Sequence, residues 1–187
     1  MLQALLEVYK AQLESKKQTQ AFITKKEIQD ITFYKGGSSL LFYRTAFLPK
    51  PSADEEKLVY NLGSLMQLSN DIFDVYKDRE NGIKTLITEA AHIQPARELL
   101  KQQLSTYYRS AYDMGFPKKN VTAFLSILSL GIFSRAFVCL DQLEKNEVLT
   151  GNKFSVQLYS RKQLICDMDG LRNKLRSARY HIRLTNE

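Results

Sequence analysis

The sequence predicts an all-α fold, a helical bundle in which residues 1–187 form a single domain, and three observations support this prediction. Apolar residues recur at helical spacing along most of the chain. Glycine and proline are scarce, with eight and four copies, and three of the prolines lie at expected segment boundaries. A hydrophobic content of 44% with a charged content of 25% allows one substantial core in 187 residues.

Two helices are expected at the N-terminus. The first covers residues 2–22, and the second follows Thr24, which suits an N-cap and has Glu27 at the capping-box position. The second helix then meets Gly36 and Gly37, and each glycine costs about 1 kcal/mol relative to alanine inside a helix. We therefore expect a helix break or a close backbone approach at this pair, caused by either packing or a ligand.

A long third helix is predicted after the linker 49–52. Ser52 or Asp54 would cap its start, and Asn81 with Gly82 would stop it at about Glu80. One apolar stripe is expected to face the core: Leu58, Leu62, Leu65, Ser69, Ile72, Phe73 and Tyr76. Five polar side chains share an arc of roughly 100° on the opposite side: Gln67, Asn70, Asp71, Asp74 and Asp78.

Four further helices are expected over residues 83–92, 95–114, 117–145 and 160–184, with a polar loop over 146–155. The apolar run 121–140 contains Arg135, a glycine and several serines, which favours a buried core helix over a membrane span. Cys139 and Cys166 lack CxxC spacing and a nearby histidine in sequence. We therefore expect two buried free thiols, with neither a zinc site nor a disulfide.

The chain is basic, with a net charge of +7 and a pI near 9.3, which is compatible with nucleic acid, a membrane surface or an anionic small molecule. The basic C-terminal helix could follow phosphates or form a solvated face. No nucleic-acid-binding motif is evident, so no nucleic-acid partner is predicted. Met1 leads directly into an amphipathic helix without a signal-peptide pattern, so we expect a cytoplasmic protein that is not transmembrane.

Asn70, Asp74 and Asp78 stand at i, i+4 and i+8, which places three oxygen-bearing side chains on one line of the long helix. Aspartates at this spacing repel each other by about 0.3 kcal/mol per pair, and a cation would remove that penalty. Mg²⁺ is the expected ion, because it prefers oxygen ligands and is commonly held by one or two carboxylates together with substrate phosphates. The alternative is a solvated acidic face, partnered by Lys77 and Arg79.

The stretch LGSLMQLSNDIFDVYKDRENGIKTL resembles the second Asp-rich region of class I isoprenoid (terpenoid) synthases. It is similar to three forms of that region. Gln67, Asn70, Asp71 and Asp74 match the FQxxDDxxD of trans-prenyltransferases, with Gly82 and Lys84 near the Gly-Lys that follows it. A second set fits the spacing of the ND-x-x-S-x-x-x-E of terpene cyclases: Asn70, Asp71, Asp74, Lys77 and Asp78. Asn70, Asp74 and Asp78 match the N-x-x-x-D-x-x-x-D of squalene and phytoene synthases.

Upstream, Lys35 and the glycines after it stand where prenyltransferases carry a Lys-Thr pair that contacts diphosphate. Together the two matches cover about residues 27–86, under half of the chain. The matches also have departures: Asn70 replaces the first Asp of the prenyltransferase form, and Asp74 and Asp78 replace the cyclase Ser and Glu. The subfamily therefore stays open.

The resemblance implies a class I isoprenoid synthase, a transferase or lyase that acts on allylic prenyl diphosphates by Mg²⁺-assisted loss of diphosphate. It implies the metal ligands Asn70, Asp71, Asp74 and Asp78, with Asp71 as an outer ligand, and the diphosphate-binding residues Lys35, Lys77, Lys84 and Gln67. No further catalytic residue is assigned. Five aromatic residues could line a prenyl cavity or belong to the core: Phe33, Phe42, Phe47, Phe124 and Phe133.

The first Asp-rich motif of that family, DDxxD, is absent from the sequence, and 54–56 and 167–169 are the only close acidic groupings. The family's chains are longer, with further helices before the position of Met1. We therefore expect the C-terminal portion of such an enzyme, inactive without the missing motif. The alternatives are a non-catalytic regulatory subunit of a prenyl diphosphate synthase and a helical interaction domain. A homodimer or a pair with a DDxxD-bearing chain is the expected assembly.

Overall fold

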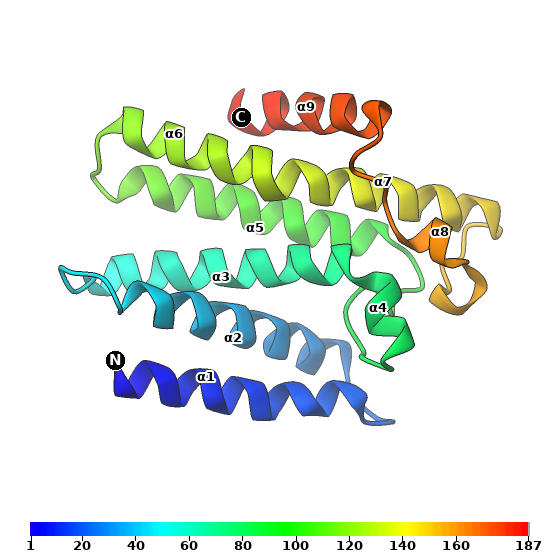
Figure 1. The fold of residues 1–187 in the computed structure, drawn as a ribbon, viewed down its shortest axis with the longest axis horizontal. Coiled ribbons are helices and arrows are strands. Elements are labelled where there is room, and N and C mark those ends of the chain that lie inside the picture. Colours follow the sequence, from blue (N-terminus) through cyan, green and yellow to red (C-terminus); the bar gives the residue numbers. More distant parts are fainter. Residues whose placement is uncertain (187) are drawn as a thin grey trace.

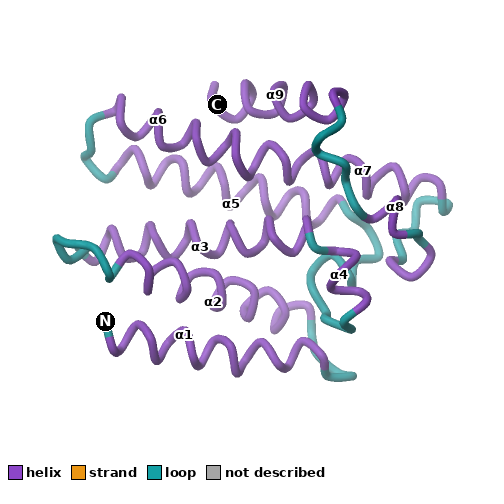
Figure 2. Tube along the Cα trace, viewed as in Figure 1, coloured by secondary structure: helices purple, strands orange, loops and turns teal. Residues whose placement is uncertain are grey.

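The structure is a computed structural model that describes residues 1–186, and every regular element in that range is helical, as predicted. The longer helices lie side by side, with α1 (Leu2–Ser15) at one edge and α9 (Leu171–Asn186) at the other (Figure 1). Figure 2 shows the loops that join them. The helices between these two edges are α2 (Lys25–Arg44), α3 (Ala53–Phe73), α5 (Gln94–Asp113), α6 (Lys118–Leu128) and α7 (Ser134–Leu149).

The N-terminal helices begin where the sequence predicts. Thr24 caps α2 with a complete capping box, in which its side chain accepts from the Glu27 backbone N–H and Glu27 accepts from the Thr24 backbone N–H. Ser52, rather than Asp54, caps α3 by accepting from the Glu55 N–H. The expected first helix over 2–22 is too long, because α1 gives way to a 3-10 turn, η1 (Lys16–Thr19).

The third helix does not run unbroken to Glu80. Its backbone leaves helical geometry at Asp74 (φ −91°, ψ 12°), and a short helix, α4 (Val75–Glu80), follows. The predicted stop is confirmed, because Gly82 has a positive φ of 64°, which favours glycine. The predicted core stripe is confirmed as well: Leu62, Leu65, Ser69 and Ile72 are buried, and Leu58, Phe73 and Tyr76 pack against the core.

Residues 83–92 form turns instead of the expected helix. The cause is partly local, because the Thr85 and Thr88 hydroxyls accept hydrogen bonds from each other's backbone N–H groups. It is partly tertiary, because the Lys84 backbone pairs with Gln18 in both directions. Ile87 and Ile93 are fully buried by this arrangement.

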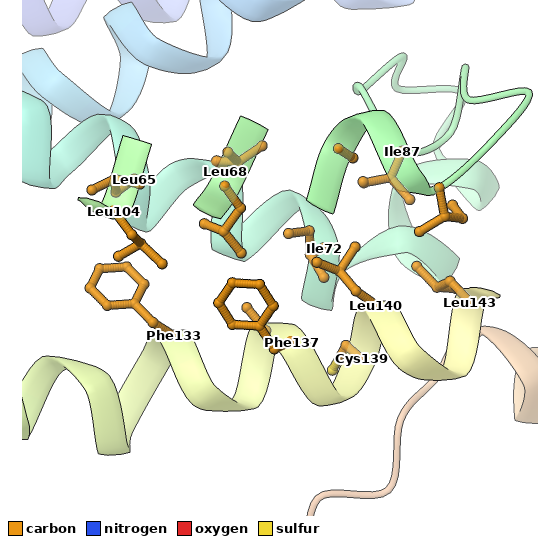
Figure 3. Close-up of a cluster of buried hydrophobic side chains, with 14 of the residues drawn as sticks. Leu65, Leu68, Ile72, Ile87, Leu104, Phe133, Phe137, Cys139, Leu140 and Leu143 are labelled. Atoms are coloured by element: carbon orange, nitrogen blue, oxygen red, sulfur yellow. The ribbon is translucent and has the colours of Figure 1, made fainter. Parts of the chain in front are cut away.

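The expected helix 117–145 is one continuous helix, Lys118–Leu149, with a π turn, η2 (Ser129–Phe133), near its middle. Among the described residues it is the one helix whose length and apolar character would also suit a membrane span, but half of its most apolar window is buried inside the protein. Its core-facing side packs against α3 and α5. Figure 3 shows this cluster, in which Phe133 lies near Leu104, Phe137 near Leu68 and Leu140 near Ile72.

The expected helix 160–184 is two helices. The first, α8 (Arg161–Leu164), follows a 3-10 turn, η3 (Val156–Leu158), and ends where Gln142 and Asn146 of α7 donate to the Gln163 carbonyl. Residues 165–170 then lead into α9. Cys139 and Cys166 are free thiols, as expected, although Cys166 is only half-buried.

Candidate functional site

Helices α2 and α3 pack backbone against backbone where Gly36 meets Gly63. A Cβ atom on Gly36 would lie 2.2 Å from the Gly63 carbonyl oxygen, and a Cβ on Gly63 would lie 2.2 Å from the Gly36 carbonyl oxygen. A Cβ on Gly37 would lie 2.6 Å from the Tyr60 ring. The predicted close backbone approach is therefore confirmed and its cause is packing, while α2 continues unbroken through both glycines.

Asp71 follows this crossing by two turns of α3 and is 4% exposed. Gln67 Nε2 donates to its Oδ1 at 2.9 Å, and Thr32 Oγ1, from α2, donates to its Oδ2 at 3.0 Å. Burial raises the pKa of Asp71 to about 6, although both hydrogen bonds and the charge of Lys35 oppose the rise. The Asp71 carboxylate is thus held in one orientation between two helices.

Asp78, on α4, is the second buried carboxylate and is 8% exposed. Burial raises its pKa to about 7, the charges of Asp71 and Asp74 add to the rise, and Lys77 and Lys35 oppose it. Within residues 1–186, no hydrogen bond contributes to the charge balance of this side chain. Asp78 is therefore a buried acid whose ionised form is poorly compensated.

Asp74 lies at the bend between α3 and α4, and its side chain is about one-third exposed. Its Oδ2 accepts from Asn70 Nδ2 at 3.3 Å and from Lys77 Nζ at 3.4 Å. Asn70 itself is exposed. The structure thus brings Asn70 and Asp74 into contact, and it places Asp78 within electrostatic reach of Asp71 and Asp74.

The three predicted lysines lie in different settings. Lys35 reaches across from α2, and its charge acts on both Asp71 and Asp78 without forming an ion pair with either. Lys77 is exposed beside Asp74. Lys84 Nζ donates to the Ala21 carbonyl at 2.6 Å, on the connection between α1 and α2.

Arg79 does not partner the acids of this site. Its Nη1 donates to the Val156 and Tyr159 carbonyls, at 3.3 and 2.6 Å, and its Nη2 pairs with Glu80 at 2.9 Å. The alternative in which Lys77 and Arg79 together neutralise a solvated acidic face therefore holds only for the Asp74–Lys77 pair. Asp71 and Asp78 belong to the interior.

The donor set suits a hard cation such as Mg²⁺ in chemical type, because every candidate ligand offers oxygen. Asp74 and Asp78 each have a carboxylate that no strong hydrogen bond occupies, and the Asn70 amide is accessible. Asp71 already accepts two hydrogen bonds, which suits an outer position. The described residues contain no group of three or more His, Cys, Asp or Glu side chains arranged to hold a metal.

An open groove of about 250 Å³ runs along the α2–α3 face beside these residues. Gln67 and Asn70 line its polar end, and Leu40, Tyr43 and Met66 line the rest. The five phenylalanines suggested as a prenyl cavity do not come together: Phe133 is fully buried in the core, whereas Phe47 and Phe124 are exposed. The apolar wall beside the acids is therefore built from other residues.

Sequence reasoning missed two residues of the site, Thr32 and Gly63. Thr32 is 2% exposed and lies 39 positions before the carboxylate that it contacts, so no local pattern could pair them. Gly63 could have been predicted, because a lone glycine inside an amphipathic helix often marks a close contact with another helix. The Gly36–Gly37 pair on the preceding helix indicates such a contact.

Comparisons with known proteins return no assignment. No protein-family model matches the sequence, and neither the curated proteins nor the solved structures contain a significant match.

Proposed function

We propose that this chain is a class I isoprenoid synthase unit that binds an allylic prenyl diphosphate together with Mg²⁺ at the Asp71–Asp74–Asp78 site. The observation that carries the proposal is a cluster of three aspartates, two of them buried, at the motif positions, facing lysines that do not fully neutralise them. A folded protein gains nothing from burying such acids unless packing requires them or a cation compensates them.

Mg²⁺ would be held by Asp74 and Asp78, with Asn70 as a neutral oxygen donor. When bound, the ion would neutralise the charge that develops on departing diphosphate. Two carboxylates and one amide are a small protein set, and they leave coordination positions for phosphate oxygens, as is usual for Mg²⁺. Asp71, whose carboxylate is held by Gln67 and Thr32, would act as an outer ligand at the α3 end of the site.

The side chains of the protein have separate tasks in this proposal. Lys35, on α2, and Lys77, on α4, both act on the acids through their charge and would contact the diphosphate oxygens. Gln67 would serve indirectly, because its amide is committed to Asp71. Lys84 would have to leave the Ala21 carbonyl to reach the same ligand, so its contribution is the smallest of the set.

The test is thermal unfolding with inorganic diphosphate, Mg²⁺, or both. We expect both together to raise the Tm of the wild type by several degrees, because ligands that bind only the folded state stabilise it by mass action. Asp74→Ala/Asp78→Ala should abolish the rise. Asp30→Ala, which removes an exposed acid of α2, is the matched control and should keep it. A wild-type Tm that does not change with Mg²⁺ and diphosphate at millimolar concentrations would refute the proposal.

A second candidate function, a regulatory subunit paired with a DDxxD-bearing chain, is favoured by one observation. The other close acids lie away from the site: Glu55, at the start of α3, pairs with Arg44, and Asp167 and Asp169 precede α9. No second Asp-rich face is present among the described residues. Affinity purification from native extract would be decisive, since a DDxxD-bearing partner is expected at equal stoichiometry, and a lone monodisperse chain would exclude this role.

A further inference from the structure

Helix α9 contacts the protein through a mixed, largely polar side and carries an apolar stripe on its solvent side. On the inner side, Ser177 Oγ bonds Ser134 Oγ at 2.8 Å, and His181 Nδ1 bonds Ser129 Oγ at 3.1 Å. Tyr180 OH donates to Asp141 Oδ1 at 2.7 Å. These hydrogen bonds, together with the stacking of Tyr180 on Phe137 at 5.2 Å and the packing of Leu184 against the core, attach α9 to the helix Lys118–Leu149.

The outer side carries an apolar stripe at i, i+4, i+7 and i+11. Leu171 is 74% exposed, Leu175 and Ile182 are each 57% exposed, and Ala178 lies between them. Four exposed basic side chains flank this stripe on both sides: Arg172, Lys174, Arg179 and Arg183. The helix contains five basic residues and no acidic one.

These basic side chains are almost unpaired. Lys174 is 4.0 Å from Asp169, whose side chain is fully exposed. Within residues 1–186, Arg172, Arg179 and Arg183 form no ion pair, and Arg176 is the one guanidinium of α9 that is paired, with Asp141 on the inner side. The outer face of α9 is therefore both apolar along its centre and cationic along its edges.

Helix α1, at the opposite edge of the array (Figure 1), shows that exposure of apolar residues alone does not define this surface. It also exposes leucines, with Leu2 at 72% and Leu5 at 48%. Its charges are balanced, because Glu7 pairs with Lys10 at 2.8 Å and Glu14 pairs with Lys17 at 2.6 Å. The exposed basic side chains that flank an apolar stripe therefore distinguish α9 from α1.

We propose that the outer face of α9 docks the protein onto an anionic phospholipid surface, with the helix lying parallel to the membrane plane. Leu171, Leu175 and Ile182 would enter the boundary between headgroups and acyl chains, and the flanking arginines would reach outward to lipid phosphates. This proposal is independent of the proposed function, because it uses none of the residues of the acidic site.

Charge complementarity favours this occupant over two others. A second copy packed through the same face would oppose two helices that each carry five basic residues and no acid. A nucleic acid would satisfy the arginines through its phosphates but would leave the central apolar stripe unused. An anionic bilayer satisfies both parts of the surface.

The test is co-sedimentation with extruded vesicles of phosphatidylcholine, with or without phosphatidylglycerol. We expect wild-type protein to pellet with the anionic vesicles only. Leu175→Ser/Ile182→Ser should weaken that binding at least tenfold, since two aliphatic side chains would no longer transfer from water into the bilayer. Arg172→Gln/Arg179→Gln/Arg183→Gln should remove the preference for anionic lipid. Leu5→Ser/Leu6→Ser on α1 is the matched control and should bind as wild type does.

A fluorescence measurement makes the test independent of sedimentation. The protein has no tryptophan, so Leu175→Trp introduces a single reporter on the outer face of α9. Its emission should shift to shorter wavelength with anionic vesicles, and that of Leu5→Trp should not. Absence of wild-type binding, or binding that is unchanged in Leu175→Ser/Ile182→Ser, would overturn the proposal. If the protein binds duplex DNA and Leu175→Ser/Ile182→Ser does not change that affinity, the face would be assigned to nucleic acid instead.

Discussion

Two groups of charged side chains with little solvent exposure in this molecule balance their charges differently. Between α5, α7 and α9, Arg97 pairs with Asp141 at 2.7 Å and with Glu144 at 2.5 Å, and Arg176 pairs with the other Asp141 oxygen. Two guanidinium groups meet two carboxylates. Burial by itself would lower the pKa of Arg97, but the hydrogen bonds and charge of Glu144 outweigh it and raise the pKa.

The Asp71–Asp74–Asp78 site at the α2–α3–α4 junction lacks such a balance. Three carboxylates face Lys35 and Lys77, and burial raises the pKa of both Asp71 and Asp78. The Arg97–Asp141 network satisfies itself and joins three helices, so its role is structural. In the proposed function, an added cation would complete the acidic site and compensate its carboxylates.

The largest expected effect comes from Asp141→Ala. Removing this carboxylate leaves Arg97 and Arg176 facing each other without their shared acid and takes away the acceptor for Tyr180. Breaking one side of a fully buried ion pair costs about 3 kcal/mol or more, and because Arg97 and Asp141 are 14% and 15% exposed we expect about 2 kcal/mol here. Urea unfolding should show this loss, whereas Asp30→Ala in an exposed pair should change stability by about 0.5 kcal/mol or less. A loss equal to that of Asp30→Ala would contradict a structural role for the network.

A smaller effect, of opposite sign, is expected from Asp78→Asn. The folded protein holds a proton on Asp78 up to a pKa of about 7, whereas the unfolded chain releases it near the ordinary value of 3.8. Stability contributed by this group therefore falls as pH rises from about 4 to about 7. Asparagine cannot ionise, so the variant should be more stable than wild type at pH 8 by about 1 kcal/mol after solvent screening, with little difference near pH 4.

Urea unfolding curves across this pH range provide the measurement for Asp78→Asn. Asp30→Asn on the exposed side of α2 is the control, and it should not reproduce the gain in stability at pH 8. A gain from Asp78→Asn that does not depend on pH would mean that packing, rather than an uncompensated charge, determines the behaviour of this position.

The smallest stability effect is expected from Lys77→Ala. The side chain is 68% exposed and its nitrogen is 3.4 Å from Asp74, so the pair contributes about 0.5 kcal/mol or less. If Lys77 contacts diphosphate, the same variant should clearly reduce the Tm rise caused by Mg²⁺ with diphosphate. Lys57→Ala, at an exposed position on α3, should leave that rise intact. Equal responses from Lys57→Ala and Lys77→Ala would remove Lys77 from the proposed ligand set.

Features that depend on neighbouring residues were predictable from the sequence. The caps at Thr24 and Ser52 and the stop at Gly82 follow from local hydrogen bonding and from backbone freedom, and all three are present. The bend at Asp74 was not predictable, because the periodic pattern continues through it. The helix expected over 83–92 was lost partly to the local hydrogen bonds between Thr85 and Thr88 and partly to contacts with Gln18, which lies 66 positions before Lys84.

The sequence predicts which side of the helix carries the acidic site, but not how deeply each of its residues is buried. Helical spacing placed Gln67, Asn70, Asp71, Asp74 and Asp78 opposite the core stripe, but it treated Asn70, Asp74 and Asp78 as equivalent and Asp71 as secondary. The structure instead buries Asp71 and exposes Asn70. This difference arises from the crossing of α2 over α3 at Gly36 and Gly63, which covers one side of the arc and leaves the other open.

The π turn in the longest helix accommodates one extra residue without disturbing the core. The Ser134 N–H bonds the Ser129 carbonyl, five positions back, so this turn holds one residue more than an α-helical turn. Each residue advances an α-helix by about 100°, so the same extra residue in a regular α-helix would rotate all of α7 by that angle relative to α6. Phe137 and Leu140 would then leave the core, and Asp141 would turn away from Arg97. A chain that lacks one residue between Ser129 and Phe133 should therefore form a regular α-helix here and keep Phe137 and Leu140 in the core.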